Sequence, residues 1–375
     1  MKYLQNIKQL NGLANQVYAS ANVGQVDSFP ENITVAVSNR CNYRCIMCME
    51  WRRETDNDLP PETIEKLGDI LPFVKTLYVT GGEPLMYPHL DMLFETALKA
   101  GCSLTMVTNG VLLTDKNIAK ILNFGLFRVK FSLDAATQKT YAKIRGGNLQ
   151  KVLMNIKKLA QAKIAHGINW PMLEVGFVAM RSNIMELPKF VSMAAGVGIN
   201  HINVSYGVAH VEEMIPESLY FMQDEADQIM LAAKDMADHI GISLTLPNQL
   251  FKDAKHAVTP VDQAPPAICE DPWRSTFIWP DGRMSMCCGG GGNTGNLNNG
   301  EFMDEWNNKA RVGARKLINT PHPPAQCKSC RTTRQNPNLT SSLFSGKVMD
   351  AAQNFIDSGE IPTPCLDASP AIHVD

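Results

Sequence analysis

The stretch between Ile33 and Pro247 alternates short apolar runs, rich in β-branched residues, with longer segments of helical periodicity. The runs that predict strands are 33–38, 76–80, 103–108, 127–133, 173–179 and 201–206. The segments that predict helices are 61–71, 89–100, 115–124, 149–166, 186–198 and 224–240. Strands that alternate with helices in this way favour a parallel sheet with helices outside it. The sequence therefore predicts an α/β fold of six strand–helix units.

Three cysteines, Cys41, Cys45 and Cys48, follow the first predicted strand on one short loop. Three thiolates at this spacing can ligate three irons of a 4Fe-4S cluster and leave the fourth iron open to another ligand. The alternatives are a zinc knuckle or three buried apolar cysteines. Structural zinc takes four ligands, usually as two close pairs, and no His or Cys follows at a knuckle's distance. We therefore interpret the loop as an iron–sulfur site with one open position.

A second motif, Gly81-Gly82-Glu83-Pro84, follows the second predicted strand. Together with the Cys-x3-Cys-x2-Cys loop it resembles the radical S-adenosylmethionine (SAM) superfamily. The resemblance implies a partial (β/α)6 barrel in which the amino and carboxylate groups of SAM chelate the open iron. It also implies reductive cleavage of SAM to a 5′-deoxyadenosyl radical, which takes a hydrogen atom from a substrate carbon. Met47 departs from the family, which usually has an aromatic residue there.

Most of the candidate cofactor-binding residues lie at or near the ends of the predicted strands, where α/β barrels carry functional residues, and Arg145 is added by the resemblance. They are Gly81, Gly82, Glu83, Asn109, Ser132, Asp134, Arg145 and Val178. The resemblance implies that Glu83 holds the SAM amino group, that Ser132 and Asp134 contact its ribose and methionyl groups, and that Arg145 pairs with its carboxylate. An arginine fork suits a carboxylate. Plain turns, helix caps, surface charge and core packing are the alternatives for these residues.

A Pro-rich break at 247–266 ends the alternation, and a second set of cysteines follows: Cys269, Cys287, Cys327 and Cys330. On spacing alone, four thiolates suit a structural zinc as well as a 4Fe-4S cluster. Cys269-x2-Pro-Trp, Asp281-Gly282, Gly295-Asn296, Glu305-Trp306 and the closing Cys-x2-Cys pair are similar to the SPASM/twitch extension of radical SAM enzymes. That similarity implies an auxiliary 4Fe-4S cluster. The shorter twitch form, with one four-cysteine cluster, fits better than the seven-cysteine SPASM form.

Three further cysteines lie outside both sets. Cys102 is expected to be an apolar core residue. Cys288 is the candidate catalytic residue, as a hydrogen-atom donor, although it is also a possible spare ligand or packed thiol. The donor role is also considered for Cys365, in the C-terminal tail.

These features divide the chain into five parts: an N-terminal helix or cap (1–30), a radical SAM partial barrel (31–247), a linker (248–267), a SPASM/twitch auxiliary cluster domain (268–335) and a C-terminal tail (336–375). The N-terminal helix carries Ile7, Leu10, Leu13 and Val17 at helical spacing. This spacing predicts an amphipathic helix that caps one end of the barrel.

Composition limits the classes of partner. The 375 residues are 45% apolar and 19% charged, which is enough for a large core and excludes a disordered chain. The net charge of −2, and basic runs no longer than pairs such as Arg52-Arg53, argue against nucleic acid and indicate solvated faces. No stretch approaches the roughly 18 to 20 apolar residues of a membrane span, and no signal-peptide core is present. We therefore expect a cytoplasmic protein with reduced cysteines.

The expected function is that of a radical SAM oxidoreductase that dehydrogenates a small molecule, with the auxiliary cluster taking the second electron. The expected partners are a small-molecule or peptide substrate and a reductant such as flavodoxin or ferredoxin. Glu174, His201 and Tyr206 are weak candidates for a general base. The alternatives are an epimerase in which a cysteine returns the hydrogen atom, a peptide-modifying maturase, and a non-enzymatic iron–sulfur or zinc module.

Overall fold

The computed structural model describes residues 2–53, 56–248, 250–255, 268–287, 292–327 and 343–364. One sheet organises this part of the chain, with its strands in the order β7-β6-β5-β4-β3-β2-β1-β8-β9. The strands are β1 Asn32–Ala36, β2 Thr76–Thr80, β3 Ser103–Thr108, β4 Arg128–Ser132, β5 Met172–Ala179, β6 His201–Tyr206, β7 Ser243–Thr245, β8 Ser275–Ile278 and β9 Met284–Ser285. Neighbouring strands are parallel except β8 and β9, which are antiparallel.

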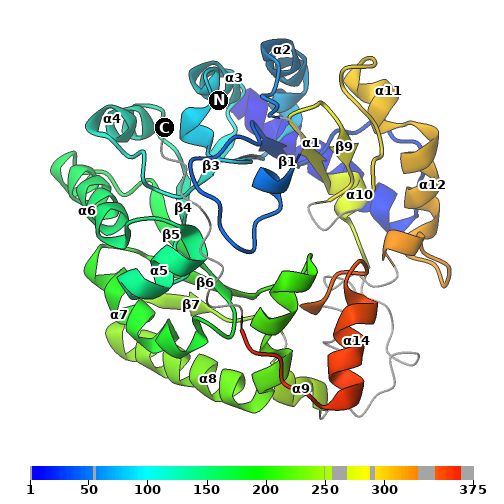
Figure 1. Cartoon of the computed structure of the whole chain (residues 1–375). Coiled ribbons are helices and arrows are strands. Elements are labelled where there is room, and N and C mark those ends of the chain that lie inside the picture. Colours follow the sequence, from blue (N-terminus) through cyan, green and yellow to red (C-terminus); the bar gives the residue numbers. More distant parts are fainter. Residues whose placement is uncertain are drawn as a thin grey trace.

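Helices cover the outer face of this curved sheet, as Figure 1 shows. Those of the barrel are α2 Pro61–Ile70, α3 Leu90–Lys99, α4 Asp115–Asn123, α5 Gln138–Arg145, α6 Leu149–Ala165, α7 Leu187–Gly196 and α8 Gln223–Ile240. Each buries one apolar stripe; Leu93, Phe94 and Ala97 of α3 are completely buried. The predicted partial α/β barrel is therefore confirmed. The short helix α5, which was not predicted, begins after the N-cap Thr137 and ends at Gly146 in a left-handed conformation.

The remaining helices are α1 Lys2–Ser20, α9 Phe251–Lys255, α10 Asp271–Arg274, α11 Phe302–Trp306, α12 Lys309–Leu317 and α14 Met349–Ser358. Helices α10, α11 and α12 lie near α1, at the end of the arc formed by the barrel (Figure 1). None of the helices in the described residues is both long and apolar enough to cross a membrane.

Strand β8 joins the cysteine-rich C-terminal segment to the barrel sheet. It pairs with β1 in parallel register, with Ile33 opposite Thr276 and Val35 opposite Ile278. Just before the two strands, the backbone N–H of Glu31 donates to the carbonyl of Arg274 at 2.8 Å. The Arg274 guanidinium Nε also lies 2.8 Å from the Glu31 carboxylate. Residues assigned to the second domain by the sequence thus extend the sheet of the first.

Helix α1 exposes most of the apolar residues that gave it its helical spacing. Leu10, Leu13 and Val17 are 68%, 53% and 62% exposed, whereas the polar residues Asn11 and Asn15 are buried. The predicted helix is present, but its apolar spacing does not mark its inner face. The cause is the chain that returns beneath the helix, because its backbone groups need hydrogen-bond partners.

Two asparagine amides of α1 supply these partners. The side-chain nitrogens of Asn11 and Asn15 donate to the carbonyl of Phe29 at 2.8 and 2.9 Å. The backbone N–H of Phe29 in turn donates to the Asn11 side-chain oxygen at 2.8 Å. On the same face, the Lys8 ammonium donates to the carbonyl of Leu71 at 3.3 Å. Burial lowers the pKa of Lys8.

We predict that Asn15→Ala lowers the free energy of unfolding by about 1 to 3 kcal/mol, because Phe29 and Ser28 each lose a buried hydrogen-bond partner. Leu13→Ala, on the exposed face, should change it by no more than about 0.5 kcal/mol. Urea unfolding of both variants followed by circular dichroism measures the difference. If Leu13→Ala lowers the free energy of unfolding more than Asn15→Ala does, the inner face of α1 is the apolar one.

Candidate functional site

The cysteine loop after β1 is fixed against the turn that follows β2. The backbone N–H of Gly82 donates to the carbonyl of Ser38 at 2.6 Å, and that of Glu83 donates to Arg40 at 2.9 Å. A Cβ atom on Gly82 would lie 1.9 Å from the Arg40 oxygen, and Gly81 has a φ of 118°. Only glycine suits both positions. The two glycines therefore let the Glu83 turn pack directly against the backbone that leads into Cys41.

Glu83 is a fully buried carboxylate at the centre of this contact. It accepts hydrogen bonds from the Thr108 hydroxyl at 2.7 Å, from the backbone N–H of Asn109 at 2.8 Å and from that of Leu85 at 3.1 Å. Burial raises the pKa of Glu83. Within the part of the chain that is described, no cationic side chain forms an ion pair with it. Since buried charges are normally paired, this carboxylate suits the amino group of a ligand such as SAM.

The three thiols lie on the cysteine loop itself. The Cys45 sulfur is 3.5 Å from Nη1 of Arg145, and the Cys41 sulfur is 3.9 Å from the side-chain nitrogen of Asn109. The backbone N–H of Glu50 donates to the Cys48 sulfur at 3.4 Å. Burial raises the pKa of Cys41 to about 12, and the neighbouring Cys45 and Cys48 add to the shift. A bound metal would favour the thiolate form of Cys41.

The donor set consists of three thiols, which are the ligands that iron–sulfur clusters take. Among the described residues, no three His, Cys, Asp or Glu side chains converge closely enough to hold one metal ion. A 4Fe-4S cluster takes each thiolate at a different iron, so its ligands are spread around it. Cys41, Cys45 and Cys48, which influence one another electrostatically without converging, suit such a group.

Asp134 and Arg145 form a buried ion pair behind the loop. Nε of Arg145 lies 2.6 Å from Oδ2 of Asp134, and Nη2 contacts the same oxygen. Burial opposes the charge of Arg145, but Asp134, Cys45 and Tyr141 together outweigh it and raise the pKa of Arg145. The other carboxylate oxygen accepts from the backbone N–H of Val178 at 2.7 Å. The pair therefore ties β4 to β5 and holds a positive charge beside Cys45.

The structure thus gathers the predicted site residues at the carboxyl ends of five adjacent strands. Cys41, Glu83 and Asn109 form one group, and Cys45, Asp134, Arg145 and Val178 form another. Ser132 is the last residue of β4, opposite Gly176. Contacts of these residues with SAM stay predictions, and the carboxylate predicted for Arg145 is supplied here by Asp134.

Asn183 is a site residue that the sequence analysis missed. It is fully buried, and its side-chain nitrogen donates to the carbonyls of Asp134 at 2.9 Å and Val178 at 2.8 Å. The sequence could have indicated Asn183 by its position just after β5, because polar residues that follow the strands of such sheets gather at one rim.

Two of the three base candidates lie away from this rim. Glu174 and His201 stand near the amino ends of β5 and β6, where Glu174 pairs with Lys130 at 3.0 Å and with His201 at 3.3 Å. Tyr206 is the last residue of β6, at the carboxyl end. Of the three, only Tyr206 shares the end of the sheet that carries the cysteine loop.

The second set of cysteines is described in part. Cys269 is held by Asn319, whose side-chain oxygen accepts from the Cys269 N–H at 2.8 Å. Cys287 follows β9, and Cys327 ends the short 3₁₀ helix Ala325–Cys327. Cys330, Cys288 and Cys365 lie outside the described residues. The four-cysteine ligand set and the donor role of Cys288 therefore stay predictions.

Two buried arginines lie beside this second set. The guanidinium carbons of Arg311 and Arg315 are 3.8 and 4.5 Å from the ring centre of Trp306. Arg311 donates to the carbonyl of Ser275 at 2.7 Å, and no described carboxylate forms an ion pair with either arginine. Burial, with the charge of Arg315, lowers the pKa of Arg311 well below its usual range, whereas nearby Cys287 opposes this shift. The arrangement favours a negatively charged group next to Cys287.

Family comparisons match both cysteine regions. Residues 35–175 match the radical SAM superfamily, and residues 269–331 match SPASM, an iron–sulfur cluster-binding domain. A probable GTP 3′,8-cyclase of Methanocaldococcus jannaschii is 30% identical over 44% of this chain and 56% of the relative. The tungsten-containing aldehyde ferredoxin oxidoreductase cofactor-modifying protein of Pyrococcus furiosus is 28% identical over 56% and 61%. The chain thus matches only about half to three fifths of the length of these relatives.

Solved structures share the fold. Streptococcus suis SuiB bound to S-adenosylmethionine superposes with a TM-score of 0.62 at 15% identity, over 81% of this chain and 71% of SuiB. The protein anSMEcpe with bound AdoMet gives 0.56 at 13% identity, over 88% and 99%. The cofactors that the two matched domains imply are 4Fe-4S clusters and SAM. With the two matches in the same order as the two cysteine sets, the chain is a radical SAM enzyme that carries a C-terminal SPASM domain.

Proposed function

We propose that this enzyme is an oxidoreductase that dehydrogenates its substrate at a carbon atom next to the cysteine loop. The observation that carries the proposal is the buried Glu83 carboxylate beside Cys41, which has no cationic partner among the described side chains. When bound at Cys41, Cys45 and Cys48, a 4Fe-4S cluster with SAM supplies a 5′-deoxyadenosyl radical that takes a hydrogen atom from the substrate.

The residues of the rim have separate tasks in this proposal. Glu83 binds the SAM amino group and is oriented for it by Thr108 and Asn109. Arg145, held by Asp134, keeps a positive charge next to Cys45. That charge favours the thiolate form of Cys45, which is the form that ligates metal. Ser132 and Val178 line the remaining cofactor surface.

The oxidative outcome is supported by the C-terminal domain. After loss of a hydrogen atom, a substrate radical must give up one more electron and a proton to become a ketone or an alkene. The proposed auxiliary ligands are Cys269, Cys287, Cys327 and Cys330. Positive charge near such a site favours gain of an electron by the group bound there. Arg311 is a basic side chain that interacts electrostatically with Cys287.

Anaerobic reconstitution tests this function. We expect about eight irons per chain, since each of two clusters holds four. A reductant such as flavodoxin or ferredoxin should then drive formation of 5′-deoxyadenosine from SAM. The product of dehydrogenation is lighter than its substrate by two hydrogen atoms, whereas an epimerase would conserve mass and incorporate solvent deuterium. About four irons together with zinc would overturn the role of the auxiliary cluster.

A peptide substrate is the second candidate. Streptococcus suis SuiB has been solved bound to the precursor peptide SuiA, and that structure superposes on 80% of this chain with a TM-score of 0.60. The shared fold is the observation that favours this candidate. A peptide-modifying enzyme would leave small-molecule candidates unchanged and alter the mass of a peptide instead.

A further inference from the structure

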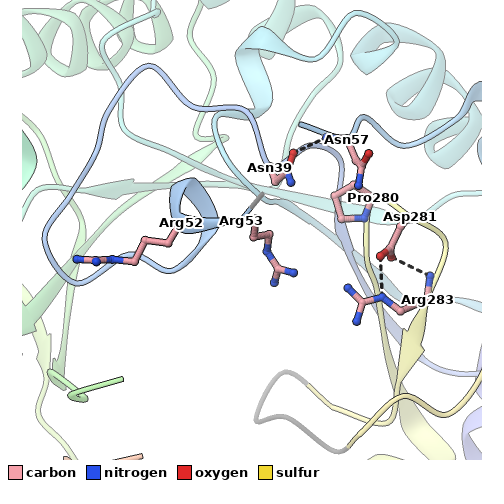
Figure 2. A pocket seen from close by; sticks show the side chains of 7 residues that line it. All are labelled: Asn39, Arg52, Arg53, Asn57, Pro280, Asp281 and Arg283. Atoms are coloured by element: carbon pink, nitrogen blue, oxygen red, sulfur yellow. Dashed lines mark hydrogen bonds and ion pairs between the residues drawn. The ribbon is translucent and has the colours of Figure 1, made fainter. Parts of the chain in front are cut away.

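A cavity of about 350 Å³ lies between the cysteine loop and the C-terminal domain (Figure 2). It is lined by Asn39, Arg52, Arg53, Asn57, Pro280, Asp281 and Arg283. We call it the arginine pocket. Its position follows from the sheet, because β1 and β8 are parallel neighbours and the segments after them emerge at the same rim. One wall is the 3₁₀ helix η1, Glu50–Arg52, which closely follows Cys48, and the other is the turn between β8 and β9.

The charges that line this pocket do not balance. Nε and Nη2 of Arg53 lie 3.0 and 3.1 Å from the two oxygens of the Glu50 carboxylate. Nε of Arg283 lies 2.6 Å from the Asp281 carboxylate. Arg52 donates to the carbonyl of Ile46 at 3.4 Å, and no carboxylate within the described ranges forms an ion pair with it. Among the described side chains of the pocket and their ion-pair partners, one positive charge is therefore in excess. The whole chain has a net charge of −2, so the excess is a local property.

The three guanidinium groups each lie over a tryptophan ring. The guanidinium carbon of Arg52 is 4.4 Å from the ring centre of Trp51. Those of Arg53 and Arg283 are 4.7 and 5.9 Å from the ring centre of Trp279. Stacking of this kind orients a guanidinium and leaves N–H groups at its edge. Glu50 takes Nε and Nη2 of Arg53, so Nη1 of Arg53 and the two Nη groups of Arg283 are the donors that can bind an oxyanion. In Figure 2, Arg53 and Arg283 extend from the two walls toward the same open space.

We propose that the arginine pocket binds an oxyanion of the substrate, a carboxylate or a phosphate group. This inference rests on the proposed function, because it places the substrate between the SAM-binding rim and the C-terminal domain. Carboxylates and phosphates are the partners that a planar arginine fork binds in two-point fashion. The substrate class is therefore an anionic molecule, anchored through its charge while a carbon elsewhere in it reacts.

Titration calorimetry on the reconstituted full-length enzyme, without reductant, tests the proposal. Inorganic pyrophosphate and citrate are the two probes, and they distinguish a phosphate site from a carboxylate site. We expect the enzyme to bind at least one probe, more weakly as salt is added, and Arg53→Gln to weaken that binding about tenfold or more. Arg53→Lys, which keeps the charge but loses the fork, should also bind more weakly than the wild type.

Arg128→Gln is the matched control, since Arg128 pairs with Glu174 near the opposite end of the sheet and should leave probe binding unchanged. The iron content of each variant shows whether its clusters still assemble. If Arg53→Gln loses iron, Arg52→Gln is titrated in its place. The proposed anion site is wrong if the enzyme binds neither probe, or if Arg53→Gln and Arg128→Gln bind the probe with equal affinity. If the enzyme cleaves SAM but binds neither probe, the proposed function stands and only the anion site is wrong. If it binds a probe but does not cleave SAM, the anion site stands and the proposed function is wrong.

Discussion

Replacing Cys41, Cys45 and Cys48 together with alanine should lower the iron content of the reconstituted enzyme from about eight to about four per chain. SAM cleavage should fall to the level of a sample without enzyme. The reason is that the three thiols of this loop have no described substitute: the nearby oxygen ligand, Glu83, is committed to Thr108 and Asn109. A colorimetric iron assay and chromatography of 5′-deoxyadenosine measure the two effects.

Cys102→Ala provides the matched control for this experiment. Cys102 directly precedes β3, and its sulfur lies 3.3 and 3.2 Å from the carbonyls of Leu71 and Val74, at the amino end of the sheet. Its removal should leave both the iron content and SAM cleavage unchanged. The assignment of the cysteine loop fails if the triple variant retains SAM cleavage, or if Cys102→Ala loses as much iron.

Asp134→Asn should lower the free energy of unfolding by about 3 to 5 kcal/mol, the cost of leaving a buried charge without its partner. Arg145 would stay charged in the interior, since the described residues offer it no second carboxylate. The substitution keeps the side-chain size, so the lost charge and not a cavity causes the effect. Urea unfolding followed by circular dichroism gives the measurement.

The exposed pair of Asp115 and Lys158 supplies the comparison. Its atoms lie 3.3 Å apart and the Asp115 side chain is 87% exposed, so Asp115→Asn should cost less than about 1 kcal/mol. Adding Arg145→Met to Asp134→Asn should recover part of the stability, because the unpaired charge is removed. Equal losses for Asp134→Asn and Asp115→Asn would show that the buried pair contributes little.

Local patterns account for what the sequence could predict. The first six strands lie within two residues of the predicted runs, because each run is apolar and bounded by turn residues. The cysteine loop was recognised because its ligands are close together in the chain. Glu83 was recognised in the same way, because it directly follows two glycines. The structure shows that these glycines allow close packing of the backbone.

The missed features depend on residues that are distant in sequence. The inner face of α1 is polar because Asn11 and Asn15 bind the backbone at Phe29, and hydrophobic spacing alone favoured the other face. Arg145 meets Asp134 only when α5 packs behind β4. Strand β8 has four residues, too few for a periodic signal, and only its pairing with β1 reveals it.

The pairing of β8 with β1 has a mechanical consequence. The loop with Cys41 leaves the carboxyl end of β1, and Cys287 follows the hairpin that β8 begins, so both cysteine regions are attached to neighbouring strands of one ladder. Backbone hydrogen bonds then hold the two cysteine-bearing segments at a fixed separation, which a flexible tether between independent domains would leave variable. A cut in the linker that removed β8 would also expose the edge of β1. The barrel and the iron–sulfur extension therefore share one sheet, although they match two separate family models.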